Sequence, residues 1–576
     1  MDIIEYSPEK ILQLEKKDPA QAEEFWQGLN PAQRLQGVLN TADAKDKLRL
    51  ILMARDSQAL TRELSNDNFV RLALDIGPED AVELIDMSSD EQLTHLLDLT
   101  GWERELLNPA RYEAWLPIIL EAGPQKVEDW LQSTDLETLT LLSRHWFDIY
   151  KYIPSQEQQE PPDDLPEFTM DGVYWLDFHD KDTAAIIAQV LVVLKSELPD
   201  LYARLMEAGR WEYDSELEEF ARRWRQGRLQ DQGFPTRAEA LSLWATPKPG
   251  EERWQNLPDK YPTAADYQPG GLSSWNSLLS GNELLPQSAY RLEQASLDNL
   301  SLEMAFIANC GVVALEADPA DMKATRQAAL EGLSLVNLGL SILSQDDPGL
   351  AQTILKRLSL TVIARQGARA IRRLNQRAWK LVHEGWLKGL PIGFNILDPP
   401  YDHWLAGLLF KLPRYYNQAK GPEYRAFLDR DELRQAEYHL TQVEFWGRII
   451  HEFLNWSRVE MLAMLTVPGW PEDPMERKLS QLLATWLARQ AMGLPGLQPL
   501  SQQQVPLAIK KLQQGLSDGS LSAQVLRSVA ILPQDEASMA RTLLERALAD
   551  LTREIINIKV GDDLNPELVV SLVVEQ

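Results

Sequence analysis

The chain has 576 residues, 44% of them hydrophobic, and a net charge of −29 at pH 7. This length predicts two to four domains, because a single hydrophobic core of that size is rare. The hydrophobic content excludes global disorder, and the negative charge opposes non-specific binding to nucleic acids or anionic membranes. The single cysteine, Cys310, excludes an intramolecular disulfide and a cysteine-based zinc site. Because it lies in the apolar run 305–310, we expect a buried, unreactive thiol.

The N-terminal region carries the signals of short antiparallel helices. Shifting the sequence by 46 residues keeps apolar positions on apolar positions and places the Gly-Pro pair at Gly77 on the pair at Gly123. Such a period is typical of stacked helical hairpins in an α-solenoid. We therefore predict that residues 66–97 and 112–143 form equivalent helix–turn–helix units. A weaker third copy begins near Pro31.

Two proline-rich stretches interrupt the helical signals that follow. Residues 154–167 are also acidic and predict an extended linker, and residues 246–274 predict a second irregular connection. A short hairpin is expected at 168–178. The β-prone tail at 568–574 could pair with 556–560, although the Asn-Pro-Glu just before the tail favours a last helix equally.

Together these signals predict an all-α fold that begins with α-solenoid-like repeats and has short strands only near 168–178 and the C-terminus. The expected segments are an acidic helical-repeat domain at 1–153, a linker at 154–167, a central helical module at 168–245, an irregular connection at 246–274 and a C-terminal helical domain at 275–576.

The central part of the chain carries a family resemblance. Its residues are Phe168-Thr-Met-Asp-Gly-Val-Tyr174, Trp211, Ser215–Glu219, Arg223-Trp224-Arg225, Gly233-Phe234-Pro235 and Glu239-Ala240-Leu241. On this block the chain resembles an uncharacterised bacterial family, one of the numbered domains of unknown function. The resemblance implies a bacterial cytoplasmic protein and no particular activity. The N-terminal repeat is similar to the helical superhelix in the cytosolic N-terminal domain of some magnesium transporters, a resemblance of fold only.

Motifs of catalysis and cofactor binding are absent from the sequence. It contains no P-loop, no Gly-rich dinucleotide-binding turn, no His-Glu-x-x-His and no serine nucleophile elbow. Glu437, Glu444 and His451 share one helical face, but a dimetal bundle needs a Glu-x-x-His motif on each of two helices. We expect a solvated polar stripe there, and we predict no catalytic residue, no cofactor and no metal.

An arginine cluster surrounds Trp224. Its members are Arg222, Arg223, Arg225 and Arg228. Guanidinium groups beside an indole can pair with a phosphate or stack on a base. However, Glu216, Glu218 and Glu219 lie one to two turns upstream, within reach of the arginines on the same helix. We therefore expect a structural, salt-bridged cluster.

The charge layout further along the chain is more informative. No acidic residue occurs between Asp347 and Glu384, where eight basic residues lie. At 100° per residue, six of them fall on one arc of a helix: Arg365, Arg369, Arg372, Arg373, Arg377 and Lys380. The opposite arc is apolar, so we predict an amphipathic helix with a buried face and a cationic face. The excess of arginine favours planar, bidentate partners such as carboxylates and phosphates.

Three interpretations of this cationic face are open. It can dock on the acidic N-terminal region, within or between chains, because residues 1–167 carry 15 basic and 34 acidic residues and hence a net charge of −19. It can be a solvated face without a partner. It can bind an external polyanion such as nucleic acid or a phosphorylated ligand. We favour docking on an acidic protein surface, because the net charge of the chain opposes nucleic-acid binding.

The sequence thus favours a cytoplasmic interaction or scaffold protein that binds a protein partner or associates with itself. The alternative is a regulator that binds nucleic acid or a phosphate ligand through 365–380. An enzyme with a pocket at 391–424 is least favoured, because no nucleophile–base pair is recognisable there. Its candidate lining residues are Asp398, Tyr401, Asp402, His403, Arg414, Tyr415 and Tyr416. No membrane contact is expected, since the apolar stretch 184–194 is too short to span a bilayer and the N-terminus lacks a signal-peptide pattern.

Overall fold

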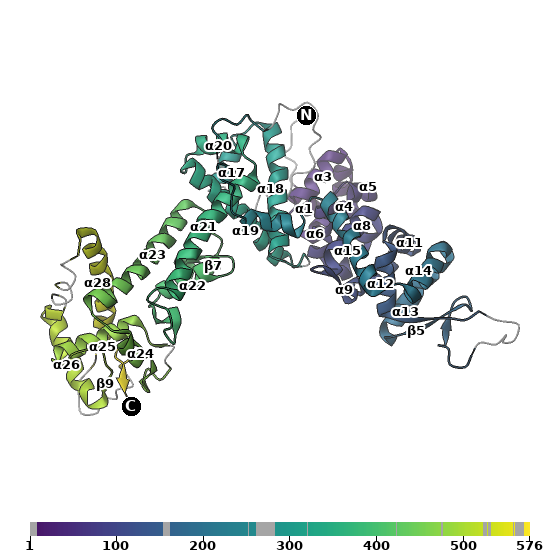
Figure 1. The fold of residues 1–576 in the computed structure, drawn as a ribbon. Coiled ribbons are helices and arrows are strands. Elements are labelled where there is room, and N and C mark those ends of the chain that lie inside the picture. Colours follow the sequence, from purple (N-terminus) through teal and green to yellow (C-terminus); the bar gives the residue numbers. More distant parts are fainter. Residues whose placement is uncertain are drawn as a thin grey trace. The chain divides into compact units, whose positions relative to one another are not determined.

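Helices dominate the computed structural model, which is 68% helical (Figure 1). Within the described part of the chain, every sheet has only two or three strands. The all-α prediction with short strands is therefore confirmed. The residues described are 8–153, 162–251, 253–260, 283–319, 321–421, 423–473, 476–521, 523, 527, 532–556, 558 and 569–575.

The chain packs as two compact units. Unit 1 contains the described residues of 1–242 and 298–332, and unit 2 contains those of 243–260, 283–297 and 333–575. The helix α19 (Met322–Ser344) contributes residues up to Gly332 to unit 1 and the rest to unit 2.

Unit 1 is built mainly from short helices. Its elements are α1 (Pro8–Glu15), α2 (Pro19–Gln27), α3 (Pro31–Asn40), α4 (Ala44–Met53), α5 (Ser57–Arg62), α6 (Asn66–Ile76), η1 (Pro78–Asp80), α7 (Val82–Met87), α8 (Asp90–Thr100), β1 (Trp102–Glu103), β2 (Leu106–Leu107), α9 (Pro109–Glu113), α10 (Leu116–Glu121), α11 (Pro124–Ser133), α12 (Leu136–Trp146), β3 (Phe147–Lys151), β4 (Phe168–Thr169), β5 (Tyr174–Phe178), α13 (Lys181–Glu197), α14 (Pro199–Trp211), α15 (Asp214–Asp231), α16 (Arg237–Leu241) and most of α18 (Gln294–Ala314).

Unit 2 has longer helices and more irregular connections. Its elements are η2 (Ser242–Trp244), α17 (Leu284–Ala289), α20 (Pro348–Arg357), α21 (Leu360–His383), η4 (Gly393–Ile396), α22 (Tyr401–Leu409), β6 (Tyr415–Asn417), η5 (Gln418–Lys420), β7 (Glu423–Arg425), α23 (Arg430–Arg448), η6 (Ile449–Phe453), α24 (Arg458–Thr466), β8 (Gly469–Trp470), α25 (Leu479–Ala491), β9 (Leu500–Ser501), η8 (Gln502–Gln504), α26 (Val505–Ser517), α28 (Gln534–Ile555) and β10 (Val574–Glu575).

The predicted repeat is present in unit 1. α8 and α12 have equal lengths and begin 46 residues apart, and α4 begins 46 residues before α8. Each of these helices follows a residue whose side chain accepts a backbone N–H at the third helical position: Asp43, Ser89 and Asp135. The 46-residue period is therefore present in these helices, and α4 extends it toward the N-terminus. The two predicted units differ in detail, because α6 is one helix where the second unit has α9 and α10, and because η1 and α7 correspond to the single helix α11.

The Gly-Pro breaker between the helices is also equivalent in the two repeats. Gly77 has φ 95° and ψ 149°, and Gly123 has φ 112° and ψ 167°, a region of backbone space essentially restricted to glycine. The proline that follows each glycine occupies the first position of the next helical segment. Buried positions recur at the same interval, as in Leu84 with Trp130 and Leu96 with Leu142. One continuous core therefore joins the repeats to the helices that follow.

The short strands agree with the sequence in one place and differ in others. The expectation of strands only near 168–178 and the C-terminus is wrong, because β1–β2 and β6–β7 form two further hairpins. β4 and β5 form the expected hairpin, and β3, directly after α12, adds a third strand to it. At the C-terminus, β10 pairs with β8 and β9. Of the two alternatives left open for the tail, a strand is present at β10, but its partners are strands distant in sequence and not the segment 556–560. Most of residues 557–568 lie outside the described residues.

Helix α18 is the most apolar long helix of the described residues. Its segment Ser296–Ala314 is long and apolar enough to cross a membrane by length and composition alone, a property that core helices of soluble proteins share. Its backbone lies directly against α19, since a Cβ on Gly311 would be 2.1 Å from the carbonyl oxygen of Ala328. Cys310 is fully buried in this helix, and burial raises the pKa of its thiol to about 12. The thiol therefore stays protonated and unreactive at neutral pH, as expected.

Replacing Gly77 or Gly123 by alanine should lower the free energy of unfolding by about 1–3 kcal/mol, because alanine avoids these backbone angles. No atom lies within 4 Å of an added Cβ at either position, so packing would not contribute. Denaturant unfolding followed by circular dichroism measures the loss. The matched control is Gly227→Ala inside α15, where space is also open; it should raise stability by about 0.5–1 kcal/mol. A neutral Gly77→Ala would contradict the turn conformation.

Candidate functional site

Helix α21 forms the amphipathic element that the charge pattern predicts. Ser359 caps its N-terminus by accepting the backbone N–H of Val362. Its apolar arc is buried and includes Ile363, Gly367 and Ile371. A Cβ on Gly367 would lie 2.4 Å from the carbonyl oxygen of Leu335, so the backbones of α21 and α19 touch. This contact fixes the rotation of α21 and with it the direction of the cationic arc.

Three of the six predicted cations bind groups of their own unit. Arg365 pairs with Glu251 at 2.8 Å. Arg372 donates hydrogen bonds to the hydroxyl of Thr246, at 2.6 Å, and to the carbonyl oxygen of Trp244. Glu251 and Thr246 belong to the connection at 246–274 that composition predicts only as irregular, and Trp244 lies at the end of the module before it.

Arg377 is the most completely neutralised of the six. It pairs with Glu444 at 2.8 Å and with Glu437 at 3.0 Å. The hydrogen bond to Glu444 raises the pKa of the Arg377 guanidinium. The expected solvated stripe on α23 is thus an ion-paired contact with α21. His451 lies beyond it, in the π-helical turn η6, and no group of His, Cys, Asp and Glu able to hold a metal is found among the described residues.

The other three cations have no ion pair or hydrogen bond within the described ranges. They are Arg369, Arg373 and Lys380. At 3.6 residues per turn they fall in a stripe about 40° wide and about 16 Å long. Arg373 and Lys380 are exposed, and Arg369 is partly buried. On the same helix, Trp379 is 49% exposed and stacks on His383 with ring centres 4.3 Å apart. We call Arg369, Arg373 and Lys380 the open stripe.

The residues proposed for a pocket at 391–424 make structural contacts, most of them with neighbouring elements. His403 stacks on Tyr416 with ring centres 5.0 Å apart, and Asp402 pairs with Lys478 at 3.2 Å. Asp398 accepts hydrogen bonds from the backbone and hydroxyl of Ser480 at the start of α25, and burial raises the pKa of its carboxyl group. The remaining residues also have partners. Among their contacts are an edge-on ring contact of Tyr401 with His439, a backbone hydrogen bond from Arg414 to Gly407, and a hydrogen bond from Tyr415 to Gln435. These contacts hold α22, the β6–β7 hairpin and α25 together.

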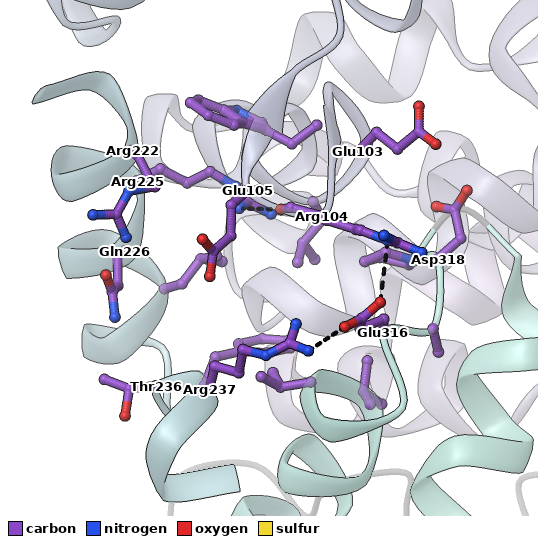
Figure 2. Close-up of a pocket in the computed structure, with 18 of the residues that line it drawn as sticks. Glu103, Arg104, Glu105, Arg222, Arg225, Gln226, Thr236, Arg237, Glu316 and Asp318 are labelled. Atoms are coloured by element: carbon purple, nitrogen blue, oxygen red, sulfur yellow. Dashed lines mark hydrogen bonds and ion pairs between the residues drawn. The ribbon is translucent and has the colours of Figure 1, made fainter. Parts of the chain in front are cut away.

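Unit 1 contains a pocket of about 340 Å³ that the sequence did not predict (Figure 2). Its walls are the β1–β2 hairpin with Arg111 of α9, the second half of α15, the start of α16, and the end of α18 with the loop after it. Apolar side chains, among them Leu229, Phe234 and Val312, alternate with charged ones. On α15 the lining residues are Arg222, Arg225, Gln226 and Leu229, whose spacing places them on one helical face.

Several charges at the rim of the pocket are paired. Glu316 pairs with Arg104 at 3.1 Å and also with Arg237, and Arg111 binds both carboxylate oxygens of Asp318. Figure 2 shows Glu316 between Arg104 and Arg237. Arg104 and Glu316 have φ angles of 59° and 53°. Arg104 lies in the two-residue turn of the β1–β2 hairpin and Glu316 directly follows α18, two positions at which turns use this conformation.

The arginine cluster of α15 divides between two kinds of contact. Arg222 and Arg223 pair with Glu219 at 2.7 and 2.8 Å, as the sequence predicts. Arg225 instead donates to the backbone carbonyls of Asp98 and Arg104, at 2.7 and 3.1 Å.

Arg228 also reaches across to the repeat helices. It binds both oxygens of Asp98, at 2.7 and 2.8 Å, and pairs with Asp135 at 3.2 Å. Asp98 is buried, with 2% of its side chain exposed. In the sequence, the spacing of the pocket-lining residues already placed them on one face of the helix. The glutamates upstream accounted for the arginines equally well, so the sequence did not predict the pocket.

Asp98→Asn should destabilise the protein by about 3–5 kcal/mol, because it leaves the partly buried guanidinium of Arg228 without its principal counter-ion. Denaturant unfolding of wild type and variant measures the difference. The control is Glu219→Gln, which removes an ion-paired but largely exposed carboxylate and should cost no more than about 1 kcal/mol. Equal effects of the two substitutions would contradict a structural role for the Asp98–Arg228 pair.

Comparison with known proteins identifies one family. The model of the family described as "Family of unknown function (DUF6178)" matches residues 23–575. Neither the curated proteins nor the solved structures contain a match.

Proposed function

We propose that this chain, which belongs to a family of unknown function, is an interaction protein: a cytoplasmic scaffold that docks an acidic protein surface on α21. The observation that carries the proposal is the open stripe. Arg369, Arg373 and Lys380 keep their charges without counter-ions among the described residues, on a helix whose other cations are paired.

Electrostatics favours an external partner for the open stripe. Like charges on one helical face repel each other, and an opposing acidic surface removes this repulsion. Arginine forms bidentate hydrogen bonds with carboxylates, which gives such a contact direction as well as charge. Trp379, which is exposed on the same helix, adds apolar area of the kind that is enriched in protein interfaces.

The partner that we propose is a second copy of the chain. Residues 1–167 carry a net charge of −19, so each copy brings an acidic region as well as the open stripe. Self-association through such complementary charges is salt-sensitive. The single cysteine is buried and needs no oxidising environment, which supports the proposed cytoplasmic location.

Single-stranded nucleic acid is the second candidate partner. It is favoured by Trp379 on the same helix, since nucleic-acid surfaces combine cations with exposed aromatic rings on which bases stack. The net charge of −29 opposes it.

The triple variant R369Q/R373Q/K380Q should weaken self-association by about 10-fold or more, because each exposed ion pair that is lost contributes roughly 0.5–1 kcal/mol to the binding free energy. Analytical ultracentrifugation of the full chain at low and high salt measures the dissociation constant, and high salt should weaken the association of the wild type and of a control variant but have little further effect on R369Q/R373Q/K380Q. The control R434Q/K510Q/K511Q removes the same charge from other exposed positions of unit 2 and should associate like wild type.

Two results would contradict this assignment. A wild type that stays monomeric at low salt excludes the second copy as the partner, and equal weakening by both triple variants reduces the effect to net charge. Fluorescence anisotropy with a labelled single-stranded oligonucleotide tests the second candidate. If nucleic acid is the partner, the wild type and the control variant bind the oligonucleotide tightly, and R369Q/R373Q/K380Q does not.

A further inference from the structure

The pocket of unit 1 contains the guanidinium of Arg225, a cation without a counter-ion in the described residues. This site does not involve the open stripe on α21. Arg225 has no carboxylate within ion-pair distance in the described part of the chain; two backbone carbonyls and the ring of Trp102 hold it, with the guanidinium 4.9 Å from the ring centre. Its Nη2 makes no hydrogen bond among the described residues. Burial lowers the pKa of Arg225, but an arginine remains charged at neutral pH. A partly buried, unneutralised charge favours the binding of an anion.

Further donors line the same wall of the pocket. Arg222 uses Nε and Nη2 for Glu219, which leaves its Nη1 without a partner in the described structure. Gln226, one turn further along α15, makes no hydrogen bond with any described residue. Figure 2 shows Arg222, Arg225 and Gln226 side by side along α15.

One carboxylate faces these donors. Glu105, at the tip of the β1–β2 hairpin, has no ion pair or hydrogen bond in the described residues, and its charge acts on both Arg222 and Arg225. In Figure 2 its side chain lies between α15 and Arg237. The pocket therefore offers several donors and the unpaired carboxylate of Glu105 beside an apolar surface that includes Leu229, Phe234 and Val312.

We propose that this pocket binds a small ligand that carries an oxyanion, carboxylate or phosphate, together with a hydrogen-bond donor. The oxyanion lies against Arg222 and Arg225, and the donor group of the ligand lies at Glu105. The pocket volume lies within the range of small-molecule sites.

The test uses the full chain and three probes: inorganic phosphate, L-glutamate and AMP. The last two combine an oxyanion with a nitrogen donor. Titration calorimetry and the shift in melting temperature, at physiological salt, should show binding of one molecule of L-glutamate or AMP per chain. Preference for one of them distinguishes a carboxylate from a phosphate ligand.

Arg222→Gln should weaken that binding by about 10-fold or more, because it removes a charged hydrogen bond. Arg223→Gln is the matched control, since Arg223 also pairs with Glu219 but does not line the pocket. Glu105→Gln should weaken L-glutamate or AMP and leave inorganic phosphate unaffected. The proposal is overturned if neither L-glutamate nor AMP binds, or if Arg223→Gln weakens binding as much as Arg222→Gln.

Discussion

The bidentate contact between Asp98 and Arg228 joins α8 to α15, two helices that contribute lining residues to the pocket of unit 1. Asp98 is buried near the end of α8, and Arg228 is near the end of α15. A buried carboxylate is stable only with full hydrogen bonding, so the two helices are held in a single register. This register places Arg225 over Trp102 and sets Arg222 and Gln226 along the pocket wall. The position of the pocket thus depends on an ion pair that does not belong to it.

In unit 2, ion pairs between helices and neighbouring segments also fix the position of a helix, α21. Arg377 of α21 lies between two carboxylates of α23, and Arg365 is held by Glu251. Because the apolar arc of α21 packs backbone to backbone against α19, the helix cannot rotate to offer its remaining cations to these acids. The open stripe is what this geometry leaves without a counter-ion. In both units a candidate site is therefore defined by charges that the fold does not neutralise.

The two sites differ in the partners that they suit. The open stripe is largely exposed and lies on a convex helical surface, where single ion pairs are weak and several must act together. This favours a large, acidic partner. Arg225 is partly buried in a concave site beside apolar side chains, where one charged hydrogen bond has a greater effect. This favours a small ligand, so the two proposals do not depend on each other.

The sequence by itself determined the local features of this protein. The 46-residue period, the Gly-Pro breakers at Gly77 and Gly123, and the cationic arc of α21 follow from backbone propensity and helical periodicity, which act over a few residues. The tertiary structure alone decided which acid meets which arginine. Asp98 reaches Arg228 from 130 positions away, Glu251 reaches Arg365 from 114, and the tail strand pairs with β8 and β9 instead of its neighbour in sequence. The pocket draws on segments separated along the chain, and no local pattern contains their distances, because these depend on how the helices pack.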